Sequence, residues 1–104
     1  MKVYHEGHTY CLQNFDNTRA HQVIQFIDKR PVSHDATGKM FTEKDGTTNE
    51  EVLSMLIDRM EYLDTKFPSE YNKVCRHHLG AALAALNART ADRKAREVEG
   101  LARK

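Results

Sequence analysis

The chain has 104 residues with a formal net charge of +1, of which 39% are hydrophobic and 30% are charged. A chain of this length makes a single small domain, which we expect to span residues 1–104, and it buries only about 60 to 70% of its unfolded surface. These values argue against a large enclosed active site and favour a homo-oligomer. There is no apolar run of about 18 residues and no apolar N-terminal signal segment, so we expect a cytoplasmic protein with no membrane partner.

Residues 9–44 predict a small antiparallel β-meander. Residues 9–15 and 22–28 are rich in β-branched and aromatic side chains, and the second run ends before Pro31. Residues 31–38 are typical of a loop, and residues 39–43 predict a third short strand before the turn at Asp45 and Gly46. Short connections between these strands favour antiparallel pairing.

Residues 48–96 predict an antiparallel helical hairpin, so the fold class is α+β. Thr48 and Glu51 fit a capping box, Pro68 ends the first helix, and Ser69 is placed to cap the second. Residues 97–104 are expected to fray. Apolar residues recur at helical spacing in the first helix at Val52, Leu53, Leu56, Ile57, Met60 and Leu63. The buried stripe expected in the second helix is Tyr71, Val74, Cys75, Leu79, Ala82, Leu83 and Leu86.

The near-neutral net charge conceals an uneven distribution. Residues 43–70 carry 3 positive and 8 negative charges, whereas residues 87–104 carry 6 positive and 3 negative ones. Steps of three or four residues from Leu86 lead to Arg89, Arg93 and Arg96, so the apolar stripe continues as a basic one. Guanidinium groups near the start of the first helix would suit a small phosphorylated ligand. The alternative is a solvated helix end paired with Asp92 and Glu97.

Tyr62 and Asn72 flank the turn at the other end of the hairpin. The ring could stack on a base and the amide could bond to its edge, although each is also a common packing or capping residue. Asn72 precedes Arg89 by 17 residues, which is about 25 Å of helix. One chain could therefore not hold a nucleotide with both ends, but two hairpins related by a two-fold axis could.

The sequence contains no pattern that indicates catalysis, a cofactor or a metal. His5 and His8, with Cys11, have a suggestive spacing for metal ligands, but no second ligand pair follows, so we expect no metal site. Neither a glycine-rich phosphate loop nor a nucleophile elbow is present. We therefore expect a protein that is not an enzyme.

Several motifs together carry a family resemblance. The most specific are residues 46–53, GTTNEEVL, and the Arg89-x-x-x-Arg93 pair. The others are Tyr10-x-Leu12-x-Asn14-Phe15, Gln22-x-Ile24-Gln25-Phe26-Ile27, Ile57-Asp58-Arg59, Phe67-Pro68-Ser69, Asn72, Ala85-Leu86-Asn87, Thr90, Asp92 and Val98-Glu99-Gly100. Over about residues 9–100 the chain resembles the phage Thoeris anti-defence sponge family, and its hairpin is similar to that of anti-CBASS cyclic-oligonucleotide sponges.

The resemblance implies a homodimer or higher homo-oligomer that sequesters a cyclic ADP-ribose isomer without cleaving it. It implies that Arg89 and Arg93 hold phosphates and ribose, Tyr62 stacks on the adenine, and Asn72 bonds to it. A basic residue of the strand region, Lys39 or Arg30, would join the site.

Several alternatives stay open. A higher oligomer could contain a second pocket for cyclic dinucleotides. From another class, the chain could be a helical-hairpin adaptor whose arginines contact an acidic protein. A nucleic-acid polymer is the least favoured partner, because residues 43–70 carry a net charge of −5.

Overall fold

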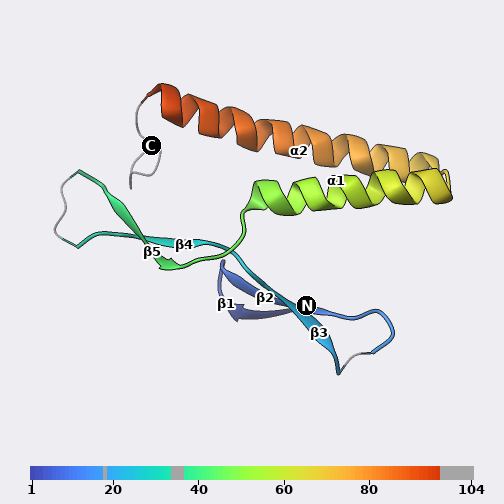
Figure 1. Ribbon diagram of the computed structural model, residues 1–104, viewed down its shortest axis with the longest axis horizontal. Helices are drawn as coiled ribbons and strands as arrows, with labels where there is room; N and C mark the ends of the chain where they lie inside the picture. Colours follow the sequence, from blue (N-terminus) through green and yellow to red (C-terminus); the bar gives the residue numbers. More distant parts are fainter. Residues whose placement is uncertain (18, 34–36, 97–104) are drawn as a thin grey trace. The chain divides into compact units, whose positions relative to one another are not determined.

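The structure is a computed structural model that describes residues 1–17, 19–33 and 37–96. Five strands precede two helices, which confirms the α+β class and the C-terminal helical hairpin (Figure 1). Contacts divide the chain into two compact units. Residues 1–48 form the strand unit, and residues 49–96, within the described part, form the helical unit. The expected single domain over residues 1–104 stays a prediction.

The first sheet of the strand unit has the order β1-β2-β3. These strands are β1 (Lys2–His5), β2 (Thr9–Gln13) and β3 (His21–Gln25), and all pairs are antiparallel. Tyr10 lies opposite Ile24, and Gly7 turns the chain between β1 and β2 with a positive φ of 78°. β1 was not predicted, because its sequence, Lys-Val-Tyr-His, does not alternate between apolar and polar residues; all four of its residues are exposed.

A second, two-stranded sheet pairs β4 (Asp28–Pro31) with β5 (Met40–Lys44). The run at residues 22–28 is thus not one strand, because it leaves the first sheet after Gln25 and enters the second at Asp28. Between the two sheets, Thr47 N donates to Gln25 O at 2.9 Å and Ile27 N donates to Thr47 O at 2.9 Å. The three-stranded meander expected from the sequence is therefore five strands in two sheets.

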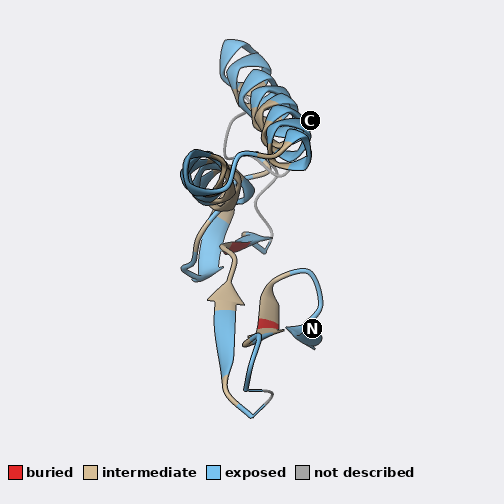
Figure 2. Cartoon of the chain, turned by 90° about the vertical axis from the view of Figure 1, so that its right-hand side faces the viewer, coloured by how far each residue is buried: buried red, intermediate tan, exposed pale blue. Residues whose placement is uncertain are grey.

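The core of the strand unit is very small. Among the described residues, only Cys11, 4% exposed, and Asp28, 0% exposed, are buried (Figure 2). The larger side chains Val3, Val23 and Phe41 are 53%, 53% and 44% exposed. Burial of apolar area by residues 1–48 alone therefore contributes little to the stability of this unit.

The helical unit consists of α1 (Asn49–Lys66) and α2 (Glu70–Ala95). α1 begins directly after Thr48, and the Ser69 side chain accepts a hydrogen bond from Tyr71 N at 3.1 Å, which confirms the predicted N-cap of α2. Asp64 Oδ1 accepts from Ser69 N at 2.9 Å and so secures the turn. The expected fraying of residues 97–104 lies outside the described residues. No described helix combines the length and the apolar character needed to cross a membrane.

The face that α2 turns inward differs from the predicted stripe. Its half-buried positions recur with alternate steps of four and three residues, the spacing of a helix packed along a helical partner. They are Asn72, Arg76, Leu79, Leu83, Leu86, Thr90 and Arg93, joined by Gly80. Tyr71 and Val74 are instead 88% and 53% exposed, and Cys75 and Ala82 are also exposed. The prediction was wrong for these four residues, because two adjacent apolar stripes share α2 and only one can face α1. The six apolar positions expected in α1 are all half-buried.

Candidate functional site

The four predicted ligand residues all lie in the helical unit. Tyr62 lies near the end of α1 and Asn72 near the start of α2, whereas Arg89 and Arg93 lie in the last two turns of α2 (Figure 1). Because the helices run antiparallel, Tyr62 and Asn72 are at the turn and the arginines are at the opposite end. The 17 residues from Asn72 to Arg89 span about 25 Å, so one hairpin does not bring the two pairs together.

Tyr62 presents an accessible aromatic ring. The residue is 59% exposed, and Lys66 Nζ lies 5.7 Å from the ring centroid, one helical turn further along α1. A cation at this distance from an exposed ring contributes about 0.5 to 1 kcal/mol. The ring is thus available for stacking, with a positive charge beside it that could approach an anionic part of a ligand.

Asn72 has a structural contact of its own. Its Nδ2 donates to Phe67 O at 3.1 Å and so satisfies a carbonyl that the end of α1 leaves without a partner. The amide oxygen of Asn72 has no such contact among the described residues, and it remains free to accept from a ligand donor. A polar pocket beside it is lined by Asp64, Thr65, Lys73 and Arg76, among others.

Ion pairs across the hairpin set the level of the arginines. Lys73 Nζ lies 3.2 Å from Asp64 Oδ2, and Arg76 Nε lies 3.4 Å from Glu61 Oε2. The same register places Asn49 level with about residue 88. Arg89 and Arg93 therefore lie at and beyond the start of α1. The first turn of α1 carries Glu50 and Glu51, which already complement its helix dipole and compete with a phosphate there.

The two arginines differ in exposure but share one feature. Arg89 is exposed and Arg93 half-buried, and within residues 1–17, 19–33 and 37–96 neither forms an ion pair with a carboxylate. Asp92, one of the two partners in the solvated-helix alternative, pairs with Arg96 at 3.0 Å, as that alternative expects for this arginine. The other invoked partner, Glu97, lies outside the described residues. As far as the described residues go, the guanidinium groups of Arg89 and Arg93 are thus available for an anionic ligand.

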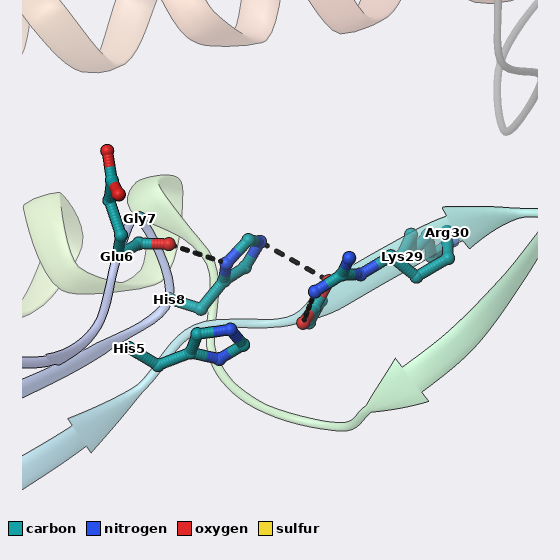
Figure 3. Close-up of a pocket in the computed structure, with 7 residues that line it drawn as sticks. His5, Glu6, Gly7, His8, Lys29 and Arg30 are labelled. Carbon is teal, nitrogen blue, oxygen red and sulfur yellow. Dashed lines mark hydrogen bonds and ion pairs between the residues drawn. The ribbon is translucent and has the colours of Figure 1, made fainter.

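The strand unit contains a polar cluster that the sequence analysis missed. Asp28 is fully buried, and its two carboxylate oxygens accept from Arg30 Nε at 2.8 Å and Nη2 at 3.0 Å. His8 Nε2 lies 3.3 Å from Asp28 Oδ1. His8 and Arg30 thus contact the same carboxylate from different segments of the chain (Figure 3). Arg30 holds the pKa of Asp28 below its ordinary value, and Asp28 raises the pKa of Arg30 in return. Asp28 and Arg30 are two residues apart on β4, so their side chains lie on the same face of the strand. This spacing is the sequence signal that could have revealed the pair.

The candidate basic residues of the strand region are therefore not equivalent. Arg30 already binds Asp28 with two hydrogen bonds, whereas Lys39 is exposed and contributes its carbonyl to a hydrogen bond from Val32 N at 2.9 Å. Of the two, only the Lys39 side chain makes no hydrogen bond or ion pair in the described part of the chain. Comparison with known protein families finds no family model that matches this chain, and comparison with curated proteins finds no significant match.

Proposed function

We propose that this protein is a non-enzymatic nucleotide sponge. It binds a cyclic ADP-ribose immune signal without cleaving it and thereby blocks Thoeris-type antiviral signalling in the cytoplasm of a bacterial host. The observation that supports this most is that an accessible tyrosine lies at one end of an antiparallel hairpin and two arginines lie at the other, and that these arginines pair with no carboxylate among the described residues.

Each end supplies a different part of the recognition. The guanidinium groups of Arg89 and Arg93, four residues apart, can donate in pairs to the diphosphate and the ribose hydroxyls. The ring of Tyr62 can stack on the adenine, and the amide oxygen of Asn72 can accept from its amino group. The separation of about 25 Å requires that the two ends come from different chains. The site is thus composite, and each homodimer holds two ligands.

Binding and the intact release of the ligand form the first test. A thermal-shift panel would compare cyclic ADP-ribose isomers with linear ADP-ribose and cyclic dinucleotides. A ligand present at 100 times its dissociation constant stabilises the folded protein by about 2.7 kcal/mol. We expect that response from a cyclic ADP-ribose isomer, and recovery of the unaltered ligand after heat denaturation. A hydrolysed product would overturn the sponge and indicate an enzyme.

The composite site makes a sharper prediction about mixed variants. Arg89→Gln with Arg93→Gln disables one half of every site, and Tyr62→Ala disables the other, so neither variant binds alone. In a heterodimer of the two, one site contains both mutated halves and the other contains both intact halves. Random mixing therefore restores about a quarter of the wild-type sites. Arg59→Gln, which removes an exposed arginine of α1, is the control and should bind normally. No recovery on mixing would contradict a site shared between chains.

A protein-interaction adaptor is the second candidate, supported by the exposed apolar side chains of α2. Tyr71 is 88% exposed and Val74 is 53% exposed, on a face that α1 does not cover. This candidate predicts no thermal response to any nucleotide. Binding to long nucleic acid would instead produce a steep dependence of affinity on salt.

A further inference from the structure

Three potential metal ligands converge in the strand unit. His5 and His8 flank the turn between β1 and β2, and Asp28 begins β4. One ligand atom from each of the three lies within 4.8 Å of the others. The two imidazole rings lie side by side, with 5.4 Å between their centroids (Figure 3). Two imidazoles and one carboxylate form a common ligand set for zinc and other first-row transition metals.

The hydrogen bond of His8 determines which of its nitrogens can bind a metal. Nδ1 lies 3.1 Å from the carbonyl oxygen of Glu6, and a carbonyl only accepts, so Nδ1 carries the hydrogen. In the neutral ring Nε2 then holds a lone pair, which faces Asp28 Oδ1 at 3.3 Å. Two acceptors at this distance need a proton or a metal cation between them. Metal-binding histidines are commonly oriented through a backbone carbonyl in this way.

The distance between His8 and Asp28 fits a shared metal ion better than a strong ion pair. Ligand atoms about 2.0 to 2.1 Å from a tetrahedral zinc ion lie about 3.3 to 3.4 Å apart, close to the 3.3 Å between His8 Nε2 and Asp28 Oδ1. A nitrogen of His5 lies within 4.8 Å of the other two ligand atoms, and the exposed His5 side chain has room to rotate toward them. Arg30 binds both carboxylate oxygens of Asp28, and Oδ1 retains a second lone pair for the metal.

The small core gives such a site a structural purpose. Only Cys11 and Asp28 are buried among the described residues. Small domains with little core are commonly held by a metal, whose binding energy becomes folding energy. Asp28 lies 20 residues beyond His8 in the sequence, so one ion would join the β1–β2 turn to β4.

We propose that His5, His8 and Asp28 bind a divalent transition-metal ion, with Zn²⁺ as the representative, and that this ion stabilises the strand unit. The proposal is independent of nucleotide binding by Tyr62, Asn72, Arg89 and Arg93, because its ligands lie in residues 1–48 and these four residues lie in residues 49–96.

The test uses the full chain after treatment with EDTA and dialysis. We expect Zn²⁺ to raise the melting temperature and Mg²⁺ to leave it unchanged, and Co²⁺ to give the visible absorption of a tetrahedral site. His5→Gln removes a ligand whose side chain is exposed, and it should weaken Zn²⁺ binding at least tenfold. His21→Gln removes an exposed histidine of β3 outside the cluster and is the matched control. Its Zn²⁺ affinity should equal that of the wild type.

Three outcomes would overturn the proposal. The first is a melting temperature that does not respond to Zn²⁺. The second is equal affinity in His5→Gln and wild type, or loss of binding only when the adjacent His77 and His78 of α2 are replaced by Gln. The third is an NMR spectrum at pH 7.5 in which both ring nitrogens of His8 stay protonated with Zn²⁺ present, because His8 would then form only an ion pair with Asp28.

Discussion

Gly46 lies where the segment after β5 passes against the end of β3. A Cβ at this position would touch Gln25 O and lie 2.7 Å from Phe26 C and 2.9 Å from Gln25 C. All three are backbone atoms, which cannot move aside as a flexible side chain can. Gly46→Ala must therefore displace the chain at residues 45–48 or distort the end of β3. The constraint is space, so any residue with a side chain should be harmful here.

The cost of this substitution follows from the two hydrogen bonds at the contact. If residues 45–48 move away, the bonds from Thr47 N to Gln25 O and from Ile27 N to Thr47 O are lost, at about 0.5 to 1.5 kcal/mol each. If both bonds persist, the overpacking costs about 1 to 3 kcal/mol. Either response destabilises the protein by about 1 to 3 kcal/mol, which lowers the melting temperature by roughly 5 to 20 °C.

Urea denaturation would measure the change in stability, and hydrogen exchange at the amides of Ile27 and Thr47 would localise it. The matched control is Gly80→Ala in α2, where the nearest atom to the new Cβ is Arg76 Nη1 at 2.7 Å, the end of a flexible side chain. Better helix propensity should make this variant neutral or more stable by up to about 1 kcal/mol. Unchanged stability and unchanged protection of both amides in Gly46→Ala would refute the reasoning.

Further predictions concern the helical unit. The hydrogen bond from Ser69 N holds the pKa of Asp64 below its ordinary value of 3.8, so Asp64 stabilises the fold above that pH and loses this contribution as the pH falls through the lowered pKa. Urea titrations from pH 2.5 to 6 should show less acid sensitivity in Asp64→Asn than in wild type, and equal sensitivity would contradict this role. Leu83→Ala should destabilise the protein by about 1 to 2.5 kcal/mol, which is about half the cost at a fully buried site. Val74→Ala, on the exposed face of α2, should change the stability by less than about 0.5 kcal/mol. Equal losses of stability in the two variants would mean that both apolar stripes of α2 are covered in solution. Tyr62→Ala should leave the melting temperature nearly unchanged, because the side chain is exposed. It should weaken binding of the cyclic ADP-ribose isomer by about 5-fold to 150-fold, the contribution of one stacked base. Calorimetry that finds undiminished affinity would remove Tyr62 from the site.

Helical structure was the part of the fold that the sequence predicted best. Local signals decide where a helix begins and ends, and Pro68 and Ser69 lie at the boundary that the structure has between α1 and α2. The strands were predicted less well. β1 is exposed along its whole length and shows no alternation, and the break between β3 and β4 depends on the contact of residues 26–27 with Thr47. A contact between segments twenty residues apart leaves no periodic signal in either segment.

The sequence alone determined the composition of the candidate nucleotide site and the separation of its two halves. The rise per residue of a helix makes 17 residues about 25 Å whatever the helix packs against. Only the tertiary structure decided which stripe of α2 faces α1, that Arg89 and Arg93 lack carboxylate partners among the described residues, and that Arg30 is engaged by Asp28. It also brought His5, His8 and Asp28 together. Spacing along a helix follows from local geometry, whereas a side chain's partner depends on which distant segment folds against it.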